Sequence, residues 1–295
     1  MSNPIFTGAG VAIVTPFHED GSVNYPALEK LLEFHIENGT DSIVICGTTG
    51  ESATLTPKEH ADVIKFTVDT VNHRIPVIAG TGSNETAYAV ELSNDAEKAG
   101  ADALLIVTPY YNKTSQRGLI QHYNFIADRV STPIVIYNVP SRTGVNVLPE
   151  TYAALCEHKN IVAAKEASGN ISQIAQTIAL CGDKLDIYSG NDDQIVPIMS
   201  LGGKGVISVL SNICPKIAHD IPALYLEGKC EESAKLQLEY LELCNAMFMD
   251  VNPIPVKVAM RMMGFDVGPL RMPLCDMDEA HTAKLEAILK KYSLI

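Results

Sequence analysis

The amino-acid sequence predicts a (β/α)8 barrel followed by a C-terminal helical extension, and three observations lead to this prediction. Eight short runs of Ile, Val and Leu recur along the chain, and each precedes a stretch with helical spacing of apolar residues. Nearly all of these runs start 25 to 34 residues after the previous one, close to the size of one βα unit. The 295 residues give enough room, because such barrels commonly span about 250 residues as one domain.

The apolar runs lack polar alternation, which is typical of parallel strands that are buried on both faces. The predicted strands are Val11–Phe17, Ser42–Cys46, Pro76–Ala79, Ala103–Thr108, Pro133–Tyr137, Ile161–Lys165, Asp186–Ser189 and Gly205–Val209. Helix signals lie between them, such as Thr56 and Pro57 at a predicted helix start. The alternative, an open doubly wound sheet, would need a GxGxxG turn after the first strand, and the sequence has none there.

The strand pattern stops at about Pro215, and four stretches with helical spacing follow it. They are Ile217–Glu227, Glu231–Met249, Pro255–Met263 and Asp278–Tyr292. We therefore expect a catalytic barrel in residues 1–225 and a helical region in residues 226–295. No Gly/Ser-rich or Pro-rich linker separates the two, so the helical region should pack on the barrel or on a second subunit.

Charge and composition limit the classes of partner. With 22 basic and 35 acidic residues the net charge is −13, whereas nucleic acids and anionic membranes select clustered Lys and Arg. The seven Cys residues stand far apart, which favours reduced thiols. No apolar run reaches the roughly 20 residues that span a bilayer, and residues 1–8 lack an export signal. We expect a cytoplasmic protein with no nucleic-acid or membrane partner.

Lys165 is the strongest candidate for catalysis, because it closes the sixth predicted strand, where barrel enzymes place their functional residues. An ammonium group in an apolar barrel loses hydration, so its pKa should fall from about 10.4 toward neutrality. The neutral amine can then form a Schiff base with a carbonyl. The alternative is a Lys that reaches the barrel mouth or pairs with an internal carboxylate. Lys257 and Arg261, four residues apart, instead suit the polar stripe of a helix, and we interpret them as structural.

Other polar residues follow the predicted strands. Tyr137 ends the fifth strand, where a phenol can relay protons, although a core-filling aromatic is the more common role. Arg142 lies in the following loop and could hold a carboxylate or form a surface ion pair. Gly47–Glu51 follows the second strand, and its glycines can expose backbone N–H groups to an anion. No Cys/His cluster or HExxH motif predicts a metal site, and we expect no cofactor.

Six motifs in this order resemble the dihydrodipicolinate synthase/N-acetylneuraminate lyase superfamily of class I aldolases. They are GTTGE (47–51), YYNK (110–113), YNVPSRTG (137–144), KEASG (165–169), SGND (189–192) and NPIPVK (252–257). The match spans the whole chain. The paired Thr48 and Thr49 and the Arg in PSRTG are similar to the dihydrodipicolinate synthase branch, whereas sialic acid lyases usually have Ser-Thr and lack this Arg.

The resemblance implies a lyase of the diaminopimelate route to lysine that joins pyruvate to L-aspartate 4-semialdehyde. Lys165 would form the Schiff base with pyruvate. Tyr137 would shuttle protons, relayed through Thr49 to Tyr111, and Tyr111 would reach in from a neighbouring subunit of a homotetramer built as a dimer of dimers. The alternative within the superfamily is an N-acetylneuraminate or 2-keto-3-deoxy-sugar acid lyase, and a silent sugar-acid binding protein on the same fold is a rival of another class.

The resemblance also assigns substrate contacts. The backbone amides of Thr48 and Thr49 would hold the pyruvate carboxylate, and Arg142 would hold the carboxylate of the semialdehyde. Gly190 and Ile207 match positions that line the pyruvate pocket and its approach.

Some family members bind L-lysine as an inhibitor near the Tyr110 loop, and this chain departs from their pattern at two positions. Pro57 replaces a His and Tyr88 replaces a Glu, whereas Ser52, Ala53, His60, Asn84 and Tyr110 match. Because the Glu would pair with the lysine ammonium, we expect weak or absent inhibition by lysine.

Overall fold

The computed structural model describes residues 4–295. Residues 1–3, which belong to the predicted barrel region 1–225, lie outside the described part. Eight parallel strands form a closed barrel in chain order, and β8 pairs with β1 to close it. The strands are β1 (Gly8–Ala12), β2 (Ser42–Ile45), β3 (Val77–Gly80), β4 (Ala103–Val107), β5 (Ile134–Asn138), β6 (Ile161–Glu166), β7 (Asp186–Ser189) and β8 (Gly205–Ser208). The predicted (β/α)8 barrel is confirmed.

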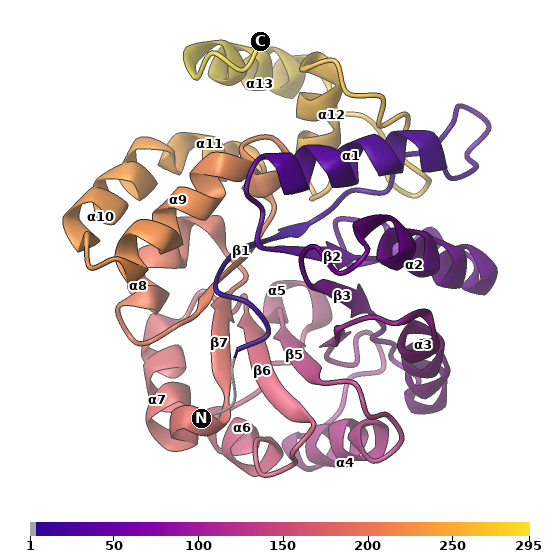
Figure 1. Cartoon of the computed structure of the whole chain (residues 1–295), viewed down its shortest axis with the longest axis vertical. Coiled ribbons are helices and arrows are strands. Elements are labelled where there is room, and N and C mark those ends of the chain that lie inside the picture. The colour runs from indigo at the N-terminus through magenta and orange to yellow at the C-terminus, as the bar shows by residue number, and fades with distance from the viewer. Residues whose placement is uncertain (1–3) are drawn as a thin grey trace.

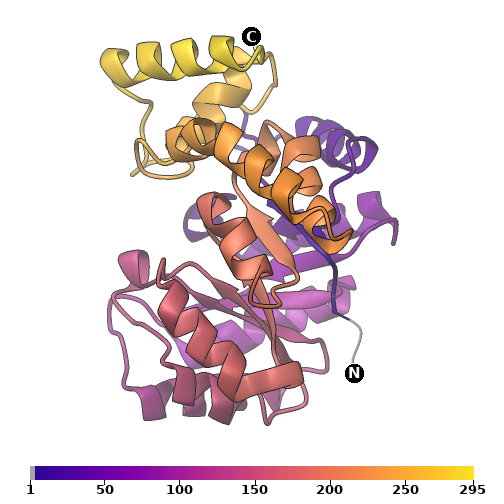
Figure 2. The ribbon, with the colours of Figure 1, turned by 90° about the vertical axis from the view of Figure 1, so that its left-hand side faces the viewer.

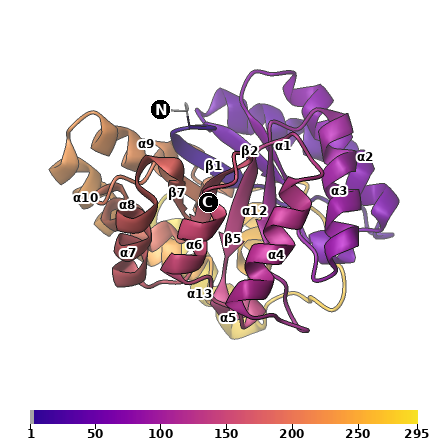
Figure 3. The same cartoon turned by 90° about the horizontal axis from the view of Figure 1, so that it is seen from below.

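Helices surround these strands, as Figures 1 and 3 show. The helices up to the last one of the barrel are α1 (Tyr25–Glu37), α2 (Pro57–Val71), α3 (Thr86–Ala99), α4 (Gln116–Ala127), α5 (Pro140–Thr143), α6 (Pro149–Leu155), α7 (Ile171–Cys181), α8 (Ile195–Met199) and α9 (Pro215–Leu226). The predicted start of α2 is correct: the Thr56 hydroxyl accepts from the backbone N–H of Glu59, the Glu59 carboxylate accepts from that of Thr56, and Pro57 takes the first turn.

The continuous apolar runs form strands because both of their faces are covered. In β4, Ala103 and Leu105 point into the barrel interior, whereas Leu104 and Ile106 belong to the cluster between the strands and the helices. Successive side chains of a strand alternate in this way, so one run supplies both layers of the core.

The first strand differs from its prediction, Val11–Phe17, and begins and ends earlier. Gly8 and Gly10 concealed its start, although the structure requires small residues there: a Cβ at Gly8 would overlap the Asp41 carboxylate at 2.1 Å. Ile13 and Val14 follow the strand and are still fully buried. Apolar residues suit these positions because the C-terminal region covers this part of the chain. The carbonyl of Val267 there accepts from the backbone N–H of Phe17.

Four further helices follow the barrel: α10 (Cys230–Glu239), α11 (Leu241–Ala246), α12 (Ile254–Met262) and α13 (Glu279–Lys291). Figure 2 shows α12 and α13 stacked at one end of the molecule, beside the C-terminus. Their buried residues, such as Val256, Met260 and Leu285, belong to the same apolar cluster as the barrel. We propose the division into a barrel of residues 1–225 and a packed helical region of residues 226–295. No helix among residues 4–295 is long and apolar enough to cross a membrane.

Candidate active site

Lys165 lies at the carboxyl end of β6 and its side chain is almost fully buried. Burial in the barrel lowers the pKa of its ammonium group to about 8; the Asp192 carboxylate opposes this shift and Arg142 adds to it. Asp192 is itself buried, and its Oδ2 accepts from the backbone N–H groups of Val209 and Leu210 at 3.0 Å each. A buried Lys with a substantial neutral fraction near pH 8 can act as a nucleophile.

Tyr137 occupies the neighbouring position on β5, in register with Lys165. The Lys165 Nζ lies 4.4 Å from the centre of the Tyr137 ring. Burial raises the pKa of the phenol, while the positive charge of Arg142 and the nearby Thr48 side chain act in the opposite direction. The phenol is therefore protonated at neutral pH and lies beside the amine, as a proton relay requires.

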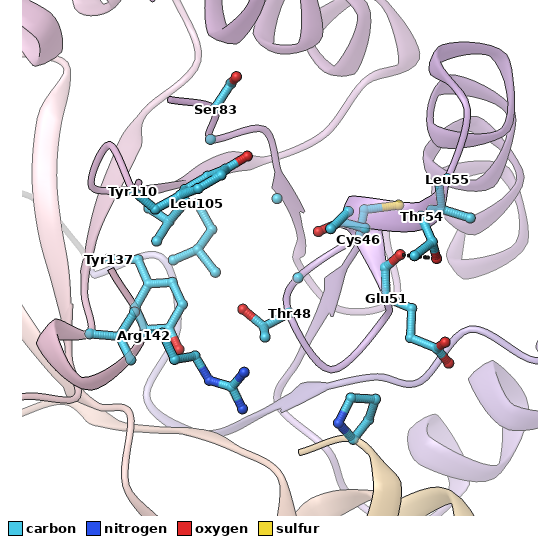
Figure 4. Close-up of a pocket in the computed structure, with 18 of the residues that line it drawn as sticks. Cys46, Thr48, Glu51, Thr54, Leu55, Ser83, Leu105, Tyr110, Tyr137 and Arg142 are labelled. Carbon is cyan, nitrogen blue, oxygen red and sulfur yellow. Dashed lines mark hydrogen bonds between the residues drawn. The ribbon is translucent and has the colours of Figure 1, made fainter. Parts of the chain in front are cut away.

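The relay predicted from the resemblance runs from Tyr137 through Thr49, and the structure also brings the Thr48 side chain close to Tyr137. The hydroxyl group next to Tyr137 is that of Thr48, whereas the Thr49 Oγ1 accepts from the Asn252 side chain at 3.0 Å. Two consecutive Thr residues in a tight turn point in different directions, so their order in the motif could not distinguish them. Figure 4 shows Thr48, Tyr137 and Arg142 around one space.

The turn that holds these Thr residues is tightly constrained. Within it, Gly50 N–H donates to the carbonyl of Gly47 and Glu51 N–H to that of Thr48, each at 3.1 Å. The Thr15 hydroxyl donates to the carbonyl of Gly50 at 2.7 Å. Glu51 adopts a left-handed backbone conformation with φ of 53°, which is uncommon for a residue other than Gly.

Lys257, on α12 of the C-terminal region, stabilises this turn. The sequence predicted that it lies on the polar stripe of a helix, and in the structure it lies in the interior. Its side chain is fully buried, and its Nζ lies 2.9 Å from Glu51 Oε1 and 2.7 Å from the carbonyl of Pro269. Glu51 Oε2 also accepts from the backbone N–H of Arg271 at 2.9 Å. Lys257 is structural, as interpreted from the sequence, but it acts as the buried partner of a carboxylate beside the site.

We expect Lys257→Met to lower the free energy of unfolding by about 3–5 kcal/mol, because it leaves the Glu51 charge buried without its partner. Chemical denaturation measures this change. The double variant Lys257→Met, Glu51→Gln should recover part of the loss, and Lys290→Met, at an exposed position, is the matched control. A loss equal to that of Lys290→Met would contradict the structural role of the pair.

Arg142 projects from α5 toward the same space, and its Nη2 donates to the backbone carbonyl of Asn252 at 3.0 Å. Asn252 thus contacts both Arg142 and Thr49, and it lines the cavity with them. The sequence motif NPIPVK contains Asn252 but predicted no role for it. Asn252 lies far along the chain from every strand, so apart from that motif nothing in the sequence indicated that it reaches the site.

Gly190 and Ile207 have different surroundings. Gly190 lines the cavity, and a methyl group there would lie 3.1 Å from Lys165 Cε and 2.8 Å from Ala167 Cβ, so the side-chain-free position leaves room for the lysine. Ile207 is fully buried in the interior layer of the barrel and is not among the residues that line the cavity in the described chain.

Tyr111 lies outside the cavity of its own chain. Its side chain is 92% exposed and its φ is 66°, a left-handed conformation that turns it outward from the loop after β4. Tyr110 is less exposed and lines a neighbouring cavity. Within the described chain, Tyr111 does not line the cavity that contains Lys165.

Two cavities meet at the carboxyl ends of the strands. One of about 410 Å³ contains Lys165, Thr49, Gly190 and Asn252, and another of about 430 Å³ contains Ser52, His60, Tyr88 and Tyr110. Eight residues line both cavities: Gly47, Thr48, Leu105, Tyr137, Val139, Arg142, Val251 and Asn252. The first cavity holds a nucleophilic amine, a phenol and a guanidinium, which suits Schiff-base chemistry on a small anionic carbonyl compound.

Comparisons with known proteins agree with this arrangement. A model of the dihydrodipicolinate synthetase family matches residues 5–292. A 4-hydroxy-tetrahydrodipicolinate synthase of Lachnoclostridium phytofermentans is 60% identical over 292 residues, and one of Clostridium acetobutylicum is 59% identical over 291 residues; each match covers 99% of both chains. The crystal structure of dihydrodipicolinate synthase from Aquifex aeolicus has a TM-score of 0.96 and 45% identity, covering 98% of this chain and 99% of that one.

Proposed function

The chain belongs to the dihydrodipicolinate synthetase family, and from that premise we propose how it condenses pyruvate with L-aspartate 4-semialdehyde, the reaction of a 4-hydroxy-tetrahydrodipicolinate synthase in lysine biosynthesis. The observation that supports this function most directly is the buried amine of Lys165, with a pKa of about 8, beside the Tyr137 phenol in a cavity that Arg142 also lines. The similar proteins are named as synthases. The sugar-acid lyase activity is the alternative that the experiment must distinguish from the synthase activity.

The reaction begins when the neutral Lys165 amine attacks the keto carbon of pyruvate, and loss of water leaves an imine. The imine withdraws electrons, so a proton leaves the methyl carbon and an enamine forms. That carbon attacks the aldehyde of the second substrate, and Tyr137 protonates the resulting alkoxide. The amino group of the second substrate then attacks the imine carbon and displaces Lys165, which closes a six-membered ring and restores the free enzyme.

The anionic groups of the substrates match the fixed donors of the site. The backbone amides of Thr48 and Thr49 lie in a turn held by hydrogen bonds, so they bind the pyruvate carboxylate without reorganisation. Arg142 binds the carboxylate of the semialdehyde through its guanidinium group. Ile207 belongs to the buried interior cluster that also contains Tyr137, so it would support the site through packing.

We further propose a homotetramer built as a dimer of dimers, in the cytoplasm, with Tyr111 of one subunit completing the Tyr137–Thr48 relay of its neighbour. The exposure of Tyr111, and the presence of Tyr137 and Thr48 together in the lining of both cavities, support this proposal. Sedimentation velocity measures the oligomeric state, and a monomer with full activity would contradict it.

The experiment that tests the function follows pyruvate by NMR in the presence of L-aspartate 4-semialdehyde. We expect pyruvate to disappear only when the semialdehyde is present. Parallel reactions contain N-acetylmannosamine or a sugar aldehyde in place of the semialdehyde and should leave pyruvate unchanged. Consumption of pyruvate with a sugar aldehyde alone would assign the chain to the lyase activity instead.

L-lysine is expected to inhibit the enzyme weakly or not at all. The cavity that contains Ser52, His60 and Tyr88 has one carboxylate among its described lining residues, Glu51, and that carboxylate is paired with Lys257. A lysine ammonium would therefore lose water without gaining an anionic partner.

Steady-state rates at increasing L-lysine measure this inhibition. The variant Tyr88→Glu, which places a carboxylate in the cavity, should become more sensitive to lysine, and Tyr88→Gln is its neutral control. Sub-millimolar inhibition of the unmodified enzyme would overturn the expectation.

A further inference from the structure

L-aspartate 4-semialdehyde, the second substrate of the proposed reaction, has three polar groups. Residues already described would contact two of them. The aldehyde meets the enamine, and Arg142 binds the carboxylate. The α-ammonium group of an amino-acid aldehyde still needs a partner, because a desolvated cation without one is costly. The inference below therefore rests on the proposed function and extends it.

Among the described residues that line the 410 Å³ cavity, only three carry an amine, a guanidinium or a carboxylate: Lys165, Arg142 and Asp250. Lys165 forms the Schiff base and Arg142 is the guanidinium at the rim. Asp250 is thus the one carboxylate among these lining residues. A cavity with a cation and an anion at its rim is complementary to a zwitterion, whereas a neutral sugar aldehyde needs neither.

The local geometry leaves part of the Asp250 carboxylate available. Asp250 follows α11 and is partly buried, and its Oδ1 accepts from the backbone N–H of Val251 at 2.6 Å. Asn252, two residues later, accepts from Arg142 Nη2 through its backbone carbonyl at 3.0 Å. One short segment therefore places Asp250 at the cavity and positions Arg142 at the same rim. Among residues 4–295, neither the Asp250 carboxylate nor the Arg142 guanidinium takes part in a salt bridge.

We propose that Asp250 binds the α-ammonium group of the aldehyde substrate while Arg142 binds its α-carboxylate, so that this pair selects an amino-acid aldehyde. Asp250 acts in binding and takes no proton. The substrate amine loses its proton to solvent before it displaces Lys165. Because Asp250 and Arg142 hold the substrate at one rim of the cavity, the amine stays on the same side of the cavity as the imine. The alternative role for Asp250 is purely local, as the acceptor that shapes the turn at Val251.

The test uses Asp250→Asn, which keeps the shape and an acceptor for the Val251 N–H but removes the charge. Steady-state kinetics with saturating pyruvate give KM and kcat for L-aspartate 4-semialdehyde. In parallel, 4-oxobutanoate, which is the same aldehyde without the amino group, is titrated as a competitor. We expect KM for the amino aldehyde to rise about 10- to 100-fold, the usual worth of a charged hydrogen bond, and the inhibition constant of 4-oxobutanoate to stay unchanged.

Three further measurements make the result specific. Asp250→Glu should restore most of the affinity for the amino aldehyde, because it restores the charge. Asp193→Asn removes one negative charge at an exposed residue outside the 410 Å³ cavity and is the matched control. Borohydride trapping of pyruvate on Asp250→Asn checks that the Schiff-base site is intact.

The outcomes separate this proposal from the proposed function. Equal loss of affinity for both aldehydes, or no loss for either, would overturn the role of Asp250 while the synthase activity of the unmodified enzyme stands. Failure of the unmodified enzyme to consume pyruvate with L-aspartate 4-semialdehyde would overturn the proposed function itself, and the proposal with it.

Discussion

Replacing Lys165 by alanine is expected to abolish both turnover and the covalent adduct with pyruvate. The amine supplies the bond on which every later step depends, and loss of a catalytic nucleophile lowers kcat by roughly 10⁵-fold or more. Mass spectrometry after borohydride reduction with pyruvate should show one reduced adduct on Lys165 in the unmodified enzyme and none in Lys165→Ala. Lys165→Arg, which keeps a positive charge beside Asp192 but cannot form an imine, should also be inactive.

The pH dependence of adduct formation tests the same residue independently. The pKa of Lys165 is lowered to about 8, so the neutral amine is the minor form below that pH and the major form above it. The initial rate of imine formation should therefore rise with pH through about 8 and then level off, whereas an unperturbed Lys would keep rising toward its ordinary pKa near 10.4. Lys184→Ala, at an exposed position, is the control that should change neither measurement. Adduct formation by Lys165→Ala would assign the nucleophile elsewhere.

The barrel could be predicted from the sequence because burial on both faces imposes a pattern that sequence retains. Strands β2 to β8 lie within one or two residues of the predicted runs, since each run of Ile, Val and Leu supplies two layers of core. The exception is β1, where close approach requires Gly8 and Gly10 and these residues weaken the strand signal.

The candidate site could be predicted in part, for reasons that depend on where each residue lies. Lys165 and Tyr137 lie at the carboxyl ends of β6 and β5, and Arg142 follows β5, so the topology alone brings them together at one end. The direction of the Thr48 and Thr49 hydroxyls depends on the turn, and sequence order could not give it. Asn252 reaches the site from beyond the last strand, and no periodicity indicates such a contact.

Lys257 shows a different limit of sequence reasoning. Its spacing from Arg261 suits the polar stripe of a helix, and the structure buries it fully against Glu51. A spacing of four residues places two side chains on one face of a helix, but it does not say whether that face meets solvent or a carboxylate from another part of the chain. Long-range pairing decides this, and a single sequence does not record it.

Tyr137→Phe is expected to lower kcat by roughly 10²–10⁴-fold, the usual contribution of a positioned acid–base group, while the pyruvate adduct still forms on Lys165. The change removes the phenol hydroxyl but keeps the ring, whose centre lies 4.4 Å from Lys165 Nζ. The packing around the amine is therefore preserved, and what is lost is the hydroxyl group that the proposed proton relay needs. Steady-state kinetics measure the loss of kcat, and borohydride trapping measures the adduct.

The matched control is Tyr123→Phe, since Tyr123 is also a fully buried phenol and its hydroxyl donates to the carbonyl of Ile106 at 3.0 Å, away from the cavity. Removing that hydroxyl should cost stability and leave kcat nearly unchanged, because no reacting atom loses a proton donor. Thr48→Val should share most of the defect of Tyr137→Phe, whereas Thr49→Val should affect KM for pyruvate more than kcat. If Thr49→Val instead reproduced the loss of Tyr137→Phe and Thr48→Val did not, the relay would run through Thr49 and Thr48 would have no role in it.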